Sequence, residues 1–169
     1  MEHNIKNNNL LNLLSDNSKQ KIDVWIRKFP EDRKQSALIA GLFIAQEQNN
    51  GYLTADLVAA VADYLNIPRI TAEESATFYS MYEHKPVGKY KICVCTNLSC
   101  MLCGSKEVVK HLEKRLGISF KQTTADGKFT LKEVECLGAC TAAPMMQIGS
   151  KYYENLTIEK IDNILNNLE

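Results

Sequence analysis

Apolar residues recur at intervals of three and four through the first half of the chain, a spacing that predicts amphipathic helices. We expect one helix over residues 18–30, with Ser18 as its capping residue, and a second over residues 32–48. Asn49-Asn50-Gly51 is a strong stop signal for the second helix. The apolar positions expected to be buried in this second helix are Leu38, Leu42, Phe43 and Ala45.

Two more helices are predicted in the first half of the chain. Thr54 is placed to cap the first of them, and Pro68 ends it. Thr71-Ala72-Glu73-Glu74 has the form of a capping box, which predicts that a further short helix begins there. Together these elements predict a helical domain over residues 18–85.

The second half of the chain has a different pattern, which predicts strands as well as helices. Residues 90–95 alternate between apolar side chains and lysine or cysteine, as strand residues do. A helix is expected between Gly104 and Gly117, with the second glycine as its stop. After a turn at Asp126-Gly127, an extended segment is expected from Phe129 towards Cys136.

A hairpin and a final helix complete the predicted elements. Met145–Ile148 and Lys151–Tyr153 flank the turn residues Gly149-Ser150, and Thr157 is placed to cap the last helix. The resulting order, β-α-β-β-α on a small sheet, is typical of a thioredoxin-like α/β domain. We expect this domain over residues 86–169.

The expected fold class is therefore α+β, an N-terminal helical bundle followed by a thioredoxin-like α/β domain. The boundary between the two is expected in the polar stretch 83–89, and residues 1–17 are expected to be a divergent, flexible N-terminus. This asparagine-rich segment has neither the apolar centre of a signal peptide nor the arginine-rich character of a transit peptide. We therefore expect the chain to remain in a reducing, cytosol-like compartment.

Charge and hydropathy argue against two classes of partner. Lysine and arginine together number 20, and so do aspartate and glutamate, so the formal net charge is zero. Nucleic-acid binding usually needs a concentrated basic face, which this sequence lacks. The longest apolar run, Ala37 to Ala45, is much shorter than the roughly 20 residues that a membrane span requires.

The six cysteines are clustered, which in a reducing compartment indicates metal or redox chemistry rather than disulfides. Cys95 ends a predicted strand and Cys100 follows it in a loop, while Cys136 and Cys140 follow an extended segment. Strand ends bring loops together at one edge of an α/β sheet, so two loops can each supply two thiolates. Four thiolates are the ligand set of a [2Fe–2S] cluster.

Other uses of these cysteines remain open from spacing alone. Structural zinc sites also use closely spaced cysteine pairs, although C-x4-C lies at the limit of their range. Cys100 and Cys103 form a C-x-x-C between a strand and a helix, the placement of a thiol–disulfide oxidoreductase motif. Cys103 also completes the C-x4-C-x2-C spacing of plant-type ferredoxins, which would leave Cys136 or Cys140 spare. Cys93 is expected to be a small buried hydrophobe.

Two segments, Val94–Leu102 and Glu135–Cys140, closely resemble the small thioredoxin-like ferredoxin subunit of NADH:quinone oxidoreductase, respiratory complex I. The resemblance extends from about Phe29 to Leu168. The chain departs from the family at Cys103, where the family commonly has arginine or another non-cysteine residue. Further matching segments are Thr77-Phe78-Tyr79, Asp126–Leu131, Ala143-Pro144 and Tyr152–Thr157.

The resemblance implies one [2Fe–2S] cluster with Cys95, Cys100, Cys136 and Cys140 as its ligands, and no catalytic residue in this chain. It implies a larger partner subunit that binds FMN and NADH, and a neighbouring iron–sulfur subunit. In a bacterium the complex would place this chain on the cytoplasmic side, peripheral to the inner membrane. The equivalent subunit of a soluble NAD-linked hydrogenase or formate dehydrogenase is the alternative. The sequence contains no G-x-G-x-x-G, in agreement with an NADH site in the partner.

Overall fold

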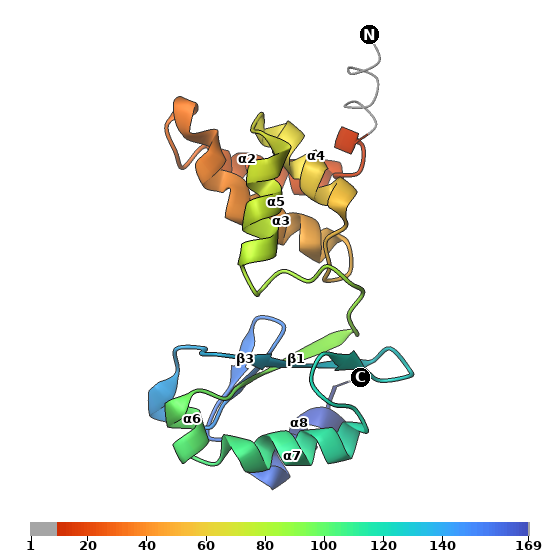
Figure 1. The fold of residues 1–169 in the computed structure, drawn as a ribbon, viewed down its shortest axis with the longest axis vertical. Helices are drawn as coiled ribbons and strands as arrows, with labels where there is room; N and C mark the ends of the chain where they lie inside the picture. Colours follow the sequence, from red (N-terminus) through yellow and green to blue (C-terminus); the bar gives the residue numbers. More distant parts are fainter. Residues whose placement is uncertain (1–9, 169) are drawn as a thin grey trace. The chain divides into compact units, whose positions relative to one another are not determined.

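The computed structural model describes residues 10–168, and the chain divides into two compact units between Pro86 and Val87 (Figure 1). This division lies within the polar stretch 83–89 of the sequence. Residues 1–17 are the N-terminus that we expect to be flexible. The first nine of them lie outside the described part of the chain. Among the remaining ones, Leu14 is buried and Ser15 caps the next helix.

The described part of the first unit is helical. Its hydrophobic core is continuous from helix to helix and includes the fully buried side chains of Ile22, Leu42 and Val61. The elements of this unit are α2 (Asp16–Ile26), the 3-10 helix η1 (Glu31–Ala37), α3 (Leu38–Gln48), α4 (Ala55–Leu65) and α5 (Arg69–Phe78).

Local signals for α4 and for the end of α3 are confirmed. The Thr54 hydroxyl accepts a hydrogen bond from the backbone N–H of Leu57, at 3.2 Å, and so caps α4. After α3, Asn50 and Gly51 both have positive φ angles, 55° and 90°, which end the helix.

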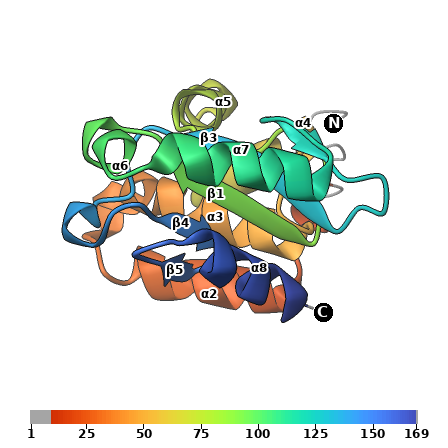
Figure 2. The same ribbon diagram turned by 90° about the horizontal axis from the view of Figure 1, so that it is seen from below.

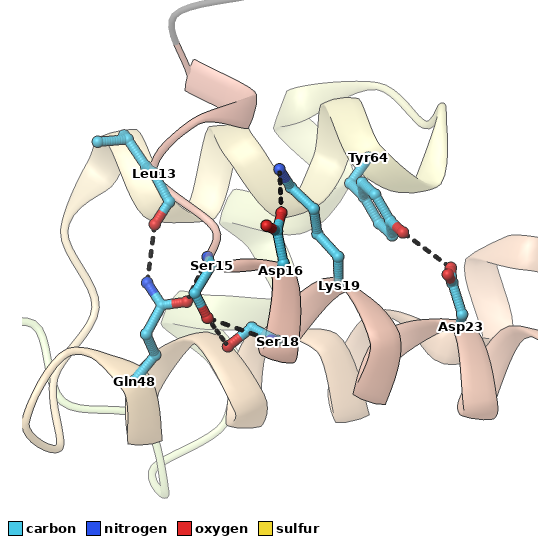
Figure 3. Close-up of polar contacts among 8 residues, drawn as sticks. All are labelled: Leu13, Ser15, Asp16, Ser18, Lys19, Asp23, Gln48 and Tyr64. Carbon is cyan, nitrogen blue, oxygen red and sulfur yellow. Dashed lines mark hydrogen bonds and ion pairs between the residues drawn. The ribbon is translucent and has the colours of Figure 1, made fainter.

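The predicted start of α2 is wrong by three residues. Ser15, rather than Ser18, caps the helix, because the Ser15 hydroxyl accepts from the Ser18 backbone N–H at 3.2 Å. Figure 3 shows why this serine is held in place: Gln48 of α3 accepts from the Ser15 backbone N–H at 2.8 Å and donates to the Leu13 carbonyl at 2.7 Å. A contact 33 residues away in sequence therefore selects the capping residue.

Three other helix predictions are corrected. The helix expected over residues 32–48 is divided into the 3-10 helix η1, which contains non-helical backbone angles at Arg33, and the α-helix α3, which begins only at Leu38. Phe43, expected to be buried, is 44% exposed. The capping box at residues 71–74 does not form, because Pro68 already starts α5 and Arg69 is its first residue.

The second unit is a five-stranded sheet with strand order β2-β3-β1-β4-β5. Strands β1 (Tyr90–Cys95) and β3 (Phe129–Val134) are parallel, and the other neighbouring strands pair antiparallel. The remaining strands are β2 (Gln122–Thr123), β4 (Met146–Ile148) and β5 (Lys151–Tyr153). The predicted strand over residues 90–95 and the hairpin are thereby confirmed.

Helices α7 (Ser105–Leu116) and α8 (Ile158–Asn166) lie side by side on one face of this sheet (Figure 2). The His111 ring of α7 and the Asp162 carboxylate of α8 are 2.8 Å apart and join the two helices. Thr157 caps α8 as expected, since its hydroxyl accepts from the Lys160 backbone N–H. The fully buried side chains of this core include Ile92, Leu112, Leu131, Met146 and Ile161.

A short helix, α6 (Leu98–Leu102), lies where the sequence predicts a loop. The Asn97 side chain accepts from the Leu98 backbone N–H at 2.7 Å and starts this helix. It places Cys100 inside a helical turn rather than in an open loop. Within the described residues, no helix has the length and apolar character needed to cross a membrane.

Candidate metal centre

Parallel pairing of β1 with β3 brings the two cysteine pairs to the same end of the sheet. Cys95 is the last residue of β1 and is paired in register with Val134, the last residue of β3. The segment that contains Cys136 therefore leaves the sheet beside the segment that contains Cys100. The Thr96 backbone N–H donates to the Val134 carbonyl at 3.3 Å and links the two segments where they leave the sheet.

Cys95 and Cys100 form a small buried cluster with Met145. Their exposed fractions are 2%, 2% and 1%, and Leu137 packs against the cluster from the second cysteine segment. The Cys95 thiol also lies 3.7 Å from the Glu135 carbonyl of that segment, within range of a weak sulfur hydrogen bond. The two segments thus meet directly at the Cys95 sulfur.

The electrostatics of Cys100 show that other thiols lie close to it. Burial, followed by a hydrogen bond with Cys95 and the nearby Cys95 and Cys140 thiols, raises the pKa of Cys100 to about 11. In the metal-free chain Cys100 is therefore a neutral thiol at physiological pH. A metal that binds here must displace the proton, as thiolate ligation generally requires.

Cys136 and Cys140 form the exposed side of the site. The Gly138 backbone N–H donates to the Cys136 sulfur at 3.3 Å, and the φ angle of Gly138 is 75°, a left-handed conformation that favours glycine. The Tyr152 hydroxyl of β5 donates to the Leu137 carbonyl at 2.9 Å and holds this segment against the sheet. An N–H group directed at sulfur is the kind of donor that stabilises a ligating thiolate.

The number of free thiols and their placement on two segments allow a test of whether this chain fits a binuclear cluster. All six cysteines are free thiols, and the four predicted ligands come as two pairs from two adjoining segments. Among residues 10–168, no three cysteine, histidine or carboxylate side chains gather around one point as ligands of a single ion. A [2Fe–2S] cluster needs only two protein thiolates at each of its two irons.

The two remaining cysteines differ from each other in burial. Cys93 lies within β1 and is only partly buried, so the expectation that it is a buried hydrophobe is too strong. Cys103 is exposed and caps the C-terminus of α6, where its backbone N–H donates to the Ser99 carbonyl. Its thiol thus lies at the surface beside the α6 turn that contains the buried Cys100.

Met145 and Tyr152 also belong to this site, although the sequence pattern does not predict it. The pattern around Met145 is that of an ordinary strand residue, yet its side chain packs on the Cys95–Cys100 pair. The contact depends on the pairing of β4 with β1 next to Cys95, for which the sequence around Met145 gives no signal. Nothing in the sequence around Tyr152 indicates that its hydroxyl reaches the cysteine segment.

The fold and the thiol pairs together define a small iron–sulfur protein of thioredoxin-like architecture. Residues 22–169 match the family model for thioredoxin-like [2Fe-2S] ferredoxins, and the chain belongs to that family. The expected α+β fold class and the family resemblance are confirmed.

The most similar relatives include E subunits of one enzyme, NADH-quinone oxidoreductase. Its E subunit from Rickettsia felis is 50% identical over 140 residues, covering 83% of this chain and 84% of the relative. The E subunit from Rickettsia conorii is 49% identical over 85% of this chain and 86% of the relative. An E subunit from Rhizobium meliloti is 42% identical over 87% of this chain and 86% of the relative.

A more distant likeness is to the solved structure of an NAD+-reducing [NiFe]-hydrogenase in its H2-reduced state. The TM-score is 0.64 with 23% identity, and the match covers 76% of this chain and 22% of that chain. At this level of identity the likeness concerns the fold alone.

Proposed function

We propose that the chain is the electron-transfer subunit of NADH:quinone oxidoreductase that holds one [2Fe–2S] cluster. Relatives of 42–50% identity, matched over more than four fifths of both chains, are all named as the E subunit of that enzyme. The structural observation that supports the proposal most directly is the meeting of two thiol pairs at the ends of the parallel strands β1 and β3. The cluster supplies one-electron acceptance and donation, which no side chain of this protein provides.

We assign Cys95 and Cys100 to one iron and Cys136 and Cys140 to the other. The first pair is buried with Met145, whereas the second pair is exposed, so the two irons would lie at different depths. The chain's role is to exclude water from the inner pair and to offer N–H donors to the outer one, such as that of Gly138. Both effects tune the reduction potential of such a cluster.

The electron partner is proposed to be a subunit that binds FMN and NADH. Its approach is expected from the exposed side of the site, because electron transfer requires a short path from flavin to cluster. Leu98 and Leu102 of α6 are 62% and 76% exposed next to this side, which suits contact with another protein surface. The sequence has no dinucleotide-binding motif, so hydride chemistry is assigned to the partner. The proposed location is the cytoplasmic, peripheral arm of the complex, beside a further iron–sulfur subunit.

Two alternatives are less well supported. The hydrogenase likeness, at 23% identity, concerns the fold and does not favour a hydrogenase over the enzyme named by the closer relatives. A thiol–disulfide oxidoreductase would need a thiol with a lowered pKa. In the Cys100–Cys103 pair, Cys100 is buried and its pKa is raised to about 11, which is the wrong direction for a nucleophile.

The test is a cysteine series on the full chain, reconstituted anaerobically with iron and sulfide. We expect two irons and two acid-labile sulfides per chain, with loss of both in Cys95→Ser, Cys100→Ser, Cys136→Ser and Cys140→Ser. Cys93→Ser and Cys103→Ser are the matched controls and should assemble normally. Loss in Cys103→Ser with assembly in Cys140→Ser would contradict the assignment and favour the plant-type ligand set. A wild-type chain without iron or sulfide would overturn the proposal.

A further inference from the structure

A pocket of about 350 Å³ lies against the first turns of α7, on the side of the helix that faces Glu133 of β3. None of the four proposed cluster ligands lines it. Its volume is at the small end of the range found for pockets that bind small molecules. Met101, Val109 and Phe120 give it an apolar side on which a ligand could pack.

Ser105 supplies a buried polar group at this pocket. The residue is 1% exposed, and its hydroxyl has no hydrogen-bond partner in residues 10–168. No side-chain nitrogen or oxygen of the described residues is both fully buried and unpaired, so this hydroxyl must open onto the pocket. Because it opens onto the pocket, this hydroxyl can bond to water there, and an oxygen atom of a ligand would take the place of that water.

The position of Ser105 adds a preference for negative charge. It is the first residue of α7, a helix of 12 residues, and the preceding Gly104 has no side chain to cap it. The first N–H groups of a helix lack intrahelical partners and give this end a partial positive charge. An anion next to Ser105 would therefore be favoured by the helix as well as by the hydroxyl.

Two lysines strengthen that preference. Lys106 and Lys110, one turn apart on α7, both line the pocket, and neither forms an ion pair within the described part of the chain. Like charges four residues apart on a helix repel each other, and an anion between them would relieve this repulsion. Glu133 also lines the pocket, but its carboxylate already accepts a 2.8 Å hydrogen bond from the Thr96 hydroxyl. Among the lining residues, two ammonium groups thus oppose one carboxylate, and Glu107 adds a second negative charge in the first turn of α7.

We propose that this pocket binds a small organic anion, a phosphate ester or a carboxylate with a compact apolar body. The charged head lies beside the Ser105 hydroxyl and the ammonium groups of Lys106 and Lys110. The apolar body packs against the lining side chains of Met101, Val109 and Phe120. This site is separate from the proposed iron–sulfur function, since it uses none of the cysteines.

The test is titration calorimetry of the full chain with four probes: phenyl phosphate, benzoate, inorganic phosphate and phenol. We expect saturable 1:1 binding of phenyl phosphate or benzoate, and whichever binds more tightly identifies the preferred head group. Inorganic phosphate lacks the apolar body and phenol lacks the anionic head, so each should bind at least about tenfold more weakly. Absence of saturable binding by both aromatic anions would overturn the proposal.

Variants locate the binding site. Lys106→Gln combined with Lys110→Gln should weaken binding by about tenfold, and Ser105→Ala by roughly three- to tenfold. Lys114→Gln is the matched control, because Lys114 is an exposed lysine of the same helix that does not line the pocket. Its affinity should equal that of the wild type. Equal weakening in Lys114→Gln and in the double variant would show nonspecific charge attraction and contradict the proposal. Far-UV circular dichroism checks that each variant is folded.

Discussion

The two units of this chain both bury apolar side chains but arrange them differently. In the helical unit, the buried residues form one continuous core to which every described α-helix contributes. In the sheet unit, the core under α7 and α8 is separate from a second, small cluster of Cys95, Cys100 and Met145. One unit thus has a single continuous apolar core, and the other has a second, smaller buried cluster that contains two thiols.

This contrast indicates where the chemistry of the fold can reside. At the ends of β1 and β3 the chain leaves the sheet, and the buried cluster there consists of Cys95, Cys100 and Met145 only. A bound cluster would tie these two segments together through four bonds and contribute to folding as structural metal sites do. The helical unit has no such dependence, so changes to the cluster and changes to the packing should affect the two units unequally.

Removal of the proposed cluster should destabilise the sheet unit and leave the helical unit unchanged. Metal–thiolate sites contribute several kcal/mol or more to the folding of the segments they join. In the apo chain, we therefore expect hydrogen-exchange protection to fall by at least about a hundredfold at residues 95–100 and 134–146. Exchange in α3 and α4 is the internal control. An equal loss of protection in α3 and α4 would mean that the two units are not energetically separate.

Truncation of one core leucine in each unit should separate stability from cluster content. Leu42 and Leu131 are both fully buried, and Leu→Ala at such positions costs about 2–5 kcal/mol. Leu131→Ala, in β3, should also lower the iron retained per chain, because β3 positions the segment that follows it. Leu42→Ala should lower the unfolding free energy, followed through the loss of helix content, without lowering the iron retained per chain.

Leu13→Ala is a control for this pair, since Leu13 is 42% exposed and its truncation should cost well under 1 kcal/mol. Denaturant unfolding followed by circular dichroism and by visible absorption measures both properties. Iron loss in Leu42→Ala equal to that in Leu131→Ala would contradict the separation of the two cores.

Local signals in the sequence are sufficient to predict much of the fold. Thr54 and Thr157 are predictable as caps because the capping bond spans only three residues, so no distant contact is needed. Ser15 and Ser18 fit the same signal equally well, and the choice between them depends on Gln48, which sequence spacing does not reveal. The prediction for Phe43 is wrong for a related reason: α3 is apolar on several sides, and periodicity does not say which side meets the other helices.

The candidate site is predictable as a set of residues but not as a geometry. The sequence places Cys95 at the end of one predicted strand and Cys136 just after another. This is enough to predict that the two residues lie at one edge of the sheet, where the structure has them. In the Cys95–Cys100 pair, the buried Cys100 lies in α6, a helix of five residues that is too short to give a periodic signal. The contact of Met145 with that pair likewise follows from strand order, which the sequence does not state.

The helix caps offer a milder perturbation that is matched between the units. Thr54→Ala and Thr157→Ala each remove a 3.2 Å hydrogen bond from a hydroxyl to an N–H group in the first turn of a helix. Each substitution should cost about 1 kcal/mol. Thr54→Ala should lower the stability of the helical unit only, and Thr157→Ala that of the sheet unit only, as measured by hydrogen exchange within α4 and α8. Replacement of either threonine by serine should keep most of the stability, because the hydroxyl remains.

A still weaker effect is expected from a hydrogen bond inside the helical unit. The Tyr64 hydroxyl of α4 donates to the Asp23 carboxylate of α2 at 2.8 Å (Figure 3). Burial, the hydrogen bond and the negative charge of Asp23 together raise the pKa of Tyr64 to about 12. At neutral pH, Tyr64→Phe should lower the unfolding free energy by about 1 kcal/mol or less.

The pH dependence of this effect has a definite sign. The unfolded chain releases the Tyr64 proton near pH 10, whereas the folded chain holds it to about pH 12. The contribution of Tyr64 is therefore complete below pH 10 and is lost as the pH rises from 10 to 12. The stability difference between the wild type and Tyr64→Phe should shrink over this interval in urea unfolding experiments.

Tyr82→Phe is the comparison variant for Tyr64→Phe. Burial also raises the pKa of Tyr82 to about 12, but the Tyr82 hydroxyl donates to the Ile39 carbonyl rather than to a carboxylate. A difference that grows with pH would mean that Asp23 does not hold the Tyr64 proton.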